Sequence, residues 1–315
     1  MRRLTIGTMI AVLGWSGLAS AQAELTGTHI RYLRVGANGA LVDIPGARSM
    51  QYSESGTAAD VTCDVYFPGS PAVGFTVLAT PAGGVAATAS NNSFSSDVTT
   101  TSAPAVTGRA IDWSGNWTTG AVDVDVTQRV EYASTDRLAR VTVTLTNGGT
   151  TSLSDVYYFF SGDPDHGECE IGTDYYTNND VVRQPPGSTS ALATASIGTP
   201  AYTFAVGSAD PRARANTSGF ENTDAFAAWN TPVDAAGALL DEDIGIVFRE
   251  PTLAPGASTT FVFYIVWGIS VAQVEARFDL AVAIGAANGT ACGTAAACLS
   301  GFCVDGVCCD TACGG

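Results

Sequence analysis

Between about residues 28 and 268, the chain alternates apolar and polar residues with a period of two, and turn residues separate the alternating runs. This pattern is typical of antiparallel β-strands that bury one face and expose the other. In the clearest run, residues 122–127, three valines alternate with Asp123, Asp125 and Thr127. The chain is therefore predicted to have an all-β fold, built as a large antiparallel β-sandwich.

Three of these runs follow one another closely. Residues 122–127, 140–146 and 154–160 are separated by turn residues and predict a meander of neighbouring strands. Earlier in the chain, residues 29–35 and 40–44 flank a Gly-Ala-Asn-Gly turn and predict a hairpin.

The end of the β pattern is a long strand. Residues 258–268 predict it, and they place four large apolar side chains on one face: Phe261, Phe263, Ile265 and Trp267. Residues 80–105 are rich in Ala, Ser, Thr and Gly, and they predict loops and weak edge strands.

The β pattern spans about 240 residues, whereas one immunoglobulin-like unit takes about 100. Two sandwiches in tandem would fit this length, but no Pro- or Ser-rich linker divides the region, which favours one large sandwich. A single C-terminal helix is predicted from Ser270, because Ser270 and Gln273 match a capping box and Val274 and Phe278 continue an apolar stripe. The predicted segments are a signal peptide at residues 1–23, a β-sandwich region at 24–268, a helix and connector at 269–286, and a cysteine-rich tail at 287–315.

The N-terminus has the pattern of a secretory signal. Arg2 and Arg3 precede an apolar stretch at residues 4–18, and small residues at 19–21 and 21–23 offer two cleavage sites. A membrane anchor is the alternative, but the stretch is shorter than the ~20 residues that a span needs. No later stretch is long and apolar enough to span a membrane, so we expect a secreted or cell-surface protein.

The formal net charge is −16, and no lysine occurs in the chain. Such a surface repels phosphate groups, so nucleic acids and anionic membrane surfaces are not expected as partners. An extracellular glycan or an envelope protein is compatible with this charge.

Six of the eight cysteines lie near the C-terminus. Their spacing contains no C-x-x-C pair and no histidine is near, which argues against a zinc or redox site. In an exported chain they predict a disulfide-rich tail, and the sequence does not determine which cysteines pair. The six are Cys292, Cys298, Cys303, Cys308, Cys309 and Cys313. Cys63 and Cys169 are predicted to pair with each other, and free buried thiols are the alternative.

The sequence GFCVDGVCCDTACGG at residues 301–315 resembles the short cysteine-rich repeat of secreted myxobacterial proteins. The resemblance covers only the tail, about a tenth of the chain. It implies a secreted or cell-surface setting and no catalysis.

Residues 161–180 form the loop with the most ionisable groups. Calcium prefers six to eight oxygen ligands, and the loop offers six carboxylates: Asp163, Asp165, Glu168, Glu170, Asp174 and Asp180. An EF-hand does not fit, because Gly167 stands at position five rather than six. The alternatives are a solvated acidic loop, or a general acid and base pair such as Asp163 and Asp165 with His166 nearby.

Trp113 and Trp117 bracket a polar tripeptide and could stack on sugar rings if they were exposed, although core packing is the simpler interpretation. The common catalytic motifs are absent, which leaves enzymatic activity open and favours a non-catalytic role. We therefore expect a secreted acidic sandwich with a binding or structural role, stabilised by calcium at the acidic loop. The alternative is a carbohydrate-active enzyme or carbohydrate-binding module on a galactose-mutarotase-like sandwich.

Overall fold

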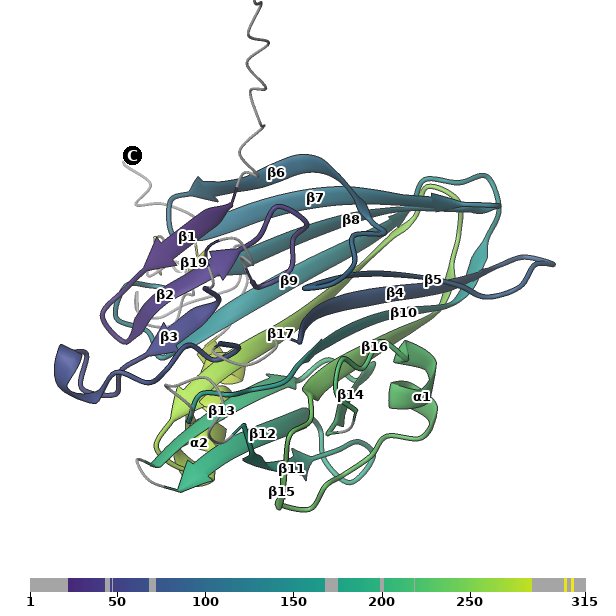
Figure 1. Ribbon diagram of the computed structural model, residues 1–315. Helices are drawn as coiled ribbons and strands as arrows, with labels where there is room; N and C mark the ends of the chain where they lie inside the picture. The colour runs from purple at the N-terminus through teal and green to yellow at the C-terminus, as the bar shows by residue number, and fades with distance from the viewer. Residues whose placement is uncertain are drawn as a thin grey trace, which may run out of the picture.

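The computed structural model confirms the all-β prediction: the chain folds into antiparallel sheets with two helices (Figure 1). It describes residues 22–42, 46, 48–67, 72–167, 175–198, 201–217, 219–284, 303–304 and 307–308. The signal sequence and most of the cysteine tail lie outside these residues, so the predictions about them stay predictions.

Two sheets form the sandwich, and both are antiparallel throughout. The large sheet has nine strands in the order β15 (Ala238–Leu240), β11 (Thr177–Arg183), β12 (Ala191–Gly198), β13 (Ala201–Ser208), β17 (Ser258–Gly268), β9 (Leu138–Asn147), β8 (Val122–Glu131), β7 (Ala110–Thr119) and β6 (Thr99–Thr107). The small sheet has five strands in the order β14 (Ala213–Asn216), β16 (Ile244–Leu253), β10 (Leu153–Gly162), β4 (Val73–Pro81) and β5 (Ala87–Asn92).

Aromatic side chains join the two sheets across one continuous core. Phe263 of β17 packs on Phe160 of β10 with ring centroids 5.1 Å apart, and Phe261 stacks on Phe248 of β16 at 4.8 Å. The four large residues predicted on one face of β17 are all fully buried, and the valines of β8 are buried while Asp125 and Thr127 are exposed. One core serves the whole β region, as a single large sandwich requires.

A third, N-terminal sheet also packs into this core. It consists of β1 (Ala23–Thr26), β2 (Ile30–Val35) and β3 (Met50–Tyr52), followed by a single 3₁₀ turn, η1 (Ala58–Asp60). Tyr52 stacks on Trp267 of β17 at 5.1 Å, and Trp267 Nε1 contacts Met50 Sδ. The N-terminal sheet therefore lies against the inner face of the large sheet.

One helix covers the outer face of each sheet. The predicted C-terminal helix is α2 (Val271–Ile284), whose Val274 and Phe278 pack on β13 and β17 of the large sheet. Its first turn is capped as expected, because Ser270 Oγ accepts a hydrogen bond from the Gln273 amide. The sequence did not predict α1 (Ala225–Asn230), which packs on β10 and β16 of the small sheet. Within the described residues, no helix has the length and hydropathy of a membrane span.

The predicted meander is wrong in its last step. Strands β7, β8 and β9 are neighbours, but β10 crosses to the small sheet, where it lies between β16 and β4. Its run Tyr157–Phe160 is apolar at every position because both faces are covered, the inner face by the large sheet and the outer face by α1. A continuous apolar run of this kind belongs in the middle of a covered sheet.

The predicted hairpin is also wrong, because residues 40–42 form no strand. Strand β2 is already paired on both sides, with β1 and β3, so no edge is left for a third partner.

The expectation of weak edge strands is confirmed, since β5 and β6 are edge strands of the small and large sheets. In the tail, the structure describes only a short hairpin of β18 (Cys303–Val304) and β19 (Val307–Cys308).

We predict that Phe263→Ala lowers the free energy of unfolding by about 3–5 kcal/mol, because the ring is fully buried between the sheets. Thr260→Ala, on the exposed face of the same strand, should change it by at most about 0.5 kcal/mol. Urea denaturation of both variants measures the difference, and equal effects would contradict the placement of the core.

Candidate functional site

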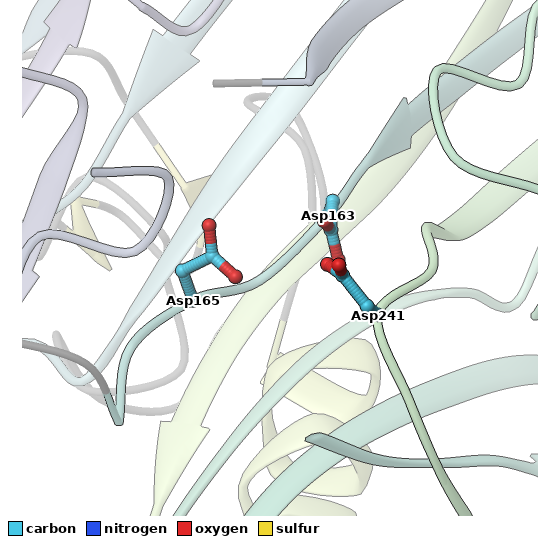
Figure 2. Close-up of side chains that lie close together, drawn as sticks. All are labelled: Asp163, Asp165 and Asp241. Carbon is cyan, nitrogen blue, oxygen red and sulfur yellow. The ribbon is translucent and has the colours of Figure 1, made fainter. Parts of the chain in front are cut away.

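The register of β10 against β16 brings acidic residues together at one end of the small sheet. Gly162, the last residue of β10, pairs with Ile244, the first residue of β16. The chain beyond Gly162 therefore runs beside the chain before Ile244, which contains Asp241 and Asp243. Asp163, Asp165 and Asp241 meet there, each offering a carboxylate oxygen within 4.8 Å of the others (Figure 2).

The segment after β10 is buried rather than solvated. Asp163 is 1% exposed, Asp165 3% and His166 1%. Backbone hydrogen bonds hold the segment in place, from the Asp163 amide to Ala72 O at 2.7 Å and from the Asp165 amide to Val65 O at 2.6 Å. The solvated-loop alternative is therefore wrong for residues 163–166.

Burial without a cation makes the Asp163 carboxyl hard to ionise. Neither of its oxygens accepts a hydrogen bond from a described residue, and the Asp241 carboxyl lies close enough to share a proton with it (Figure 2). Desolvation, reinforced by the charges of Asp165 and Asp243, raises the pKa of Asp163 to about 10. An ionised Asp163 needs a positive charge beside it.

A second buried carboxyl lies next to the cluster. Asp243 is 3% exposed and accepts hydrogen bonds from Ser161 Oγ at 2.5 Å and from the Asn222 amide at 3.0 Å. Desolvation raises its pKa to about 7, against these hydrogen bonds, which favour the charged form. The negative charge of Asp243 contributes to the raised pKa of Asp163. The pKa of the Tyr66 hydroxyl is also raised, by burial and by the charges of Asp243 and the other neighbouring carboxyls.

His166 does not complete the cluster. Its ring packs edge-on against Trp267, with centroids 5.4 Å apart, and burial lowers its pKa to about 4. It is therefore neutral at physiological pH and is not among the residues whose ligand atoms converge.

The other residues predicted from sequence do not join this cluster. Asp180 lies on β11, where desolvation and the nearby charge of Asp234 raise its pKa. Glu168, Glu170 and Asp174 lie outside the described residues. Of the three predicted carboxylates that the structure describes, Asp163 and Asp165 lie in the cluster and Asp180 does not; their binding of calcium stays a prediction.

The two tryptophans considered as sugar platforms are core residues. Trp113 is 2% exposed and Trp117 4%, and Trp113 packs against Phe75 of the small sheet. Neither ring offers an exposed face, because both point inward from β7. Cys63 is buried, and its predicted partner Cys169 lies outside the described residues, so their pairing stays a prediction.

Sequence reasoning missed Asp241 and Asp243. They belong to an acidic run, residues 241–243, directly before a predicted strand, and that run was the available signal. Its importance depends on strand pairing between segments far apart in the chain, which periodicity does not reveal.

Three converging carboxylates are a ligand set for a hard cation. Asp241 retains contact with solvent, so an ion could reach the cluster, while Asp163 and Asp165 supply buried oxygens. The same groups are poorly placed as a catalytic acid and base, because two of the three are almost inaccessible to a substrate.

No protein-family model matches the chain, and no curated protein matches it. Among solved structures, it is similar to a galactose mutarotase-like protein from Lactobacillus casei (10% identity, TM-score 0.40, 78% of this chain and 100% of that one). It is also similar to a proposed kojibiose phosphorylase from the human microbiome (8% identity, TM-score 0.36, 84% of this chain and 27% of that one). A third similar structure is a polysaccharide lyase (10% identity, TM-score 0.36, 82% of this chain and 34% of that one). The chain thus spans about a quarter of the phosphorylase and a third of the lyase. At these identities and TM-scores, the likenesses assign neither a family nor an activity.

With metal ions removed by a chelator, we predict that stability falls as pH rises from about 7 to about 9, by up to about 1.4 kcal/mol per pH unit. In this window an unfolded aspartate is ionised, whereas folded Asp163 still holds its proton because its pKa is about 10. Because the pKa of Asp163 is higher in the folded protein than in the unfolded chain, its contribution to stability is complete below the pKa of the unfolded aspartate. That contribution is lost as the pH rises toward the pKa of the folded protein. Urea denaturation at several pH values measures the slope. Asp163→Asn should flatten it, and an unchanged slope in that variant would contradict the assignment.

Proposed function

We propose that this protein is a secreted β-sandwich with a binding or structural role outside the cell, and that a calcium ion held by Asp163, Asp165 and Asp241 stabilises it. The observation that carries the proposal is the buried Asp163 carboxyl, which faces Asp241 and finds no hydrogen-bond donor among the described residues unless one of the two carboxyls holds a proton. A buried carboxylate needs either a proton or a cation, since its desolvation is costly.

Calcium is favoured over softer metal ions by the chemistry of the donors. All three ligands are carboxylates, and together they supply three to six of the six to eight oxygens that calcium takes. Softer metals prefer sulfur or imidazole, which this cluster does not offer among the described residues.

The cation would have a structural effect, because its ligands come from two distant segments. Asp163 and Asp165 follow β10, whereas Asp241 precedes β16. An ion bound between them joins the ends of two central strands of the small sheet and neutralises charges that otherwise repel one another.

The extracellular setting rests on sequence features. The signal pattern at residues 1–23, the cysteine-rich tail and the acidic composition agree with export. Calcium at extracellular concentrations suits a site of moderate affinity.

We predict that calcium raises the melting temperature of the chelator-treated protein. At about a hundredfold excess over its Kd, the ion should add about 2.7 kcal/mol to the free energy of unfolding. Asp163→Asn and Asp241→Asn should remove most of this effect, because each removes a ligand. Differential scanning calorimetry with calcium, with magnesium and with EDTA makes the comparison.

Asp180→Asn is the matched control, since Asp180 is an acidic residue of the same region that lies outside the cluster. Its variant should respond to calcium as the wild type does. The proposal fails if calcium leaves the wild-type melting temperature unchanged, or if the Asp241 variant responds fully.

We further predict that cleavage takes place at the first of the two candidate sites, so that export removes residues 1–21 rather than the whole predicted segment 1–23. Ala23 is already part of β1, where it is 6% exposed and pairs with Val35, so cleavage after residue 23 would shorten that strand. N-terminal sequencing of the secreted protein should begin at Gln22, and a first residue inside β1 would contradict cleavage after residue 21.

A further inference from the structure

The helix α2, on the outer face of the large sheet (Figure 1), is apolar on the side that faces away from the sheet. Four exposed residues recur at spacings of four and three positions and therefore lie on one side of the helix: Ala272, Ala276, Leu280 and Ala283. Leu280 is 58% exposed, and Ile269, directly before the helix cap, is 46% exposed. These five residues are the α2 stripe. Surface helices ordinarily carry charged and polar side chains on the side away from the core.

The charged residues of α2 do not interrupt this stripe, because ion pairs hold each of them against the body of the protein. Arg183 of β11 binds both Glu275 and Asp279, with Nε–Oε1 and Nη2–Oδ2 distances of 3.0 Å. Arg277 binds Glu54, with Nη2 and Oε1 2.8 Å apart. In a chain with a net charge of −16, the α2 stripe is thus left without a charge. A helix that is apolar on two opposite sides is typical of a position between two layers.

The α2 stripe is too small to hold a second copy of the chain by itself. From Ile269 to Ala283 the chain rises about 21 Å, and a helix with its side chains is about 10 Å wide, which gives a face of about 200 Å². A stable protein–protein interface buries about 800 Å² on each partner. A segment that is already tethered to the chain needs far less area, because its effective concentration is on the order of millimolar. The size of the stripe therefore favours an occupant from the same chain.

The segment that follows α2 has the composition and the length for this role. Residues 285–302 connect α2 to the hairpin of β18 and β19, and they lie outside the described residues. No charged residue occurs between Asp279 and Asp305, and six of the 18 residues in the segment are alanine. A chain of this length reaches up to about 60 Å when extended, so it can run back along the whole α2 stripe. Gly285 stands directly after the helix, where glycine commonly lets the chain turn.

We propose that residues 285–302 fold back over the outer face of α2 and cover the α2 stripe, so that the cysteine-rich tail is docked on the sandwich. The alanines of the stripe leave room for the larger apolar residues of the segment, Leu299 and Phe302. The association is driven by the removal of apolar surface from water. It uses no ligand of the proposed calcium site, so it does not depend on the ion.

Hydroxyl-radical footprinting of the full exported chain tests the proposal, because the oxidation rate of a leucine side chain rises with its exposure. Leu239 on β15 is the internal control, since it is a leucine that is also 58% exposed. If the tail covers the α2 stripe, Leu280 should be oxidised several-fold more slowly than Leu239.

Limited proteolysis of a variant tests the same contact from the side of the tail. Elastase cleaves after alanine, and residues 285–302 should resist it while they are docked. Leu280→Glu places a charge in the stripe and should raise the cleavage rate within this segment by about tenfold or more, because cleavage follows the population of the undocked form. Glutamate is a good helix former and Leu280 is exposed, so the fold should tolerate the change. Leu239→Glu is the matched control and should leave the cleavage rate unchanged.

Light scattering of the wild type and of the Leu280 variant identifies the occupant. A monomeric wild type in which Leu280 is oxidised slowly supports the proposal. The proposal is overturned if Leu280 is oxidised as fast as Leu239, or if elastase cleaves residues 285–302 equally fast in the wild type and in the Leu280 variant. It is also overturned if the wild type is a dimer that Leu280→Glu dissociates, since a second copy would then cover the stripe.

Discussion

The antiparallel register of β10 against β16 is the constraint on which the proposed cation site depends. Because Gly162 faces Ile244, the chain leaving one strand and the chain entering the other lie side by side. This junction brings Asp163, Asp165 and Asp241 together, and it places Ser161 within hydrogen-bond distance of Asp243. A slip of one residue would exchange the faces of every side chain on one of the strands and separate these carboxylates.

Burying these carboxyls opposes folding, and the rest of the sandwich has to compensate for it. Without a cation, the desolvation of Asp163 keeps its carboxyl protonated at neutral pH, where an unfolded aspartate would be ionised. The compensation comes from a core shared by three sheets and joined by aromatic contacts such as Phe160 with Phe263 and Tyr52 with Trp267. Such a cost is retained at a site when the buried groups have a function, and cation binding would supply one.

The sequence predicted what depends on local periodicity. The strand positions of β8, β9 and β17, their buried faces and the cap of α2 at Ser270 all follow from patterns within a few residues. It paired β8 with β9 correctly, but it could not predict where the chain changes sheets, so it placed β10 beside β9 instead of in the other sheet. For the same reason it found Asp163 and Asp165 but not Asp241, whose contact with them is set by tertiary register. It also could not show that Trp113 is buried while Phe94 is exposed, because both follow from how the sheets pack.

The most direct test of the account is calorimetric titration of the chelator-treated protein with calcium near neutral pH, repeated in buffers that differ in ionisation enthalpy. If calcium replaces the proton on Asp163, one ion per chain should bind and the apparent enthalpy should depend on the buffer, because binding releases a proton. No saturable binding would contradict the account, and so would binding whose enthalpy is the same in every buffer, since Asp163 would then not be exchanging its proton for the ion.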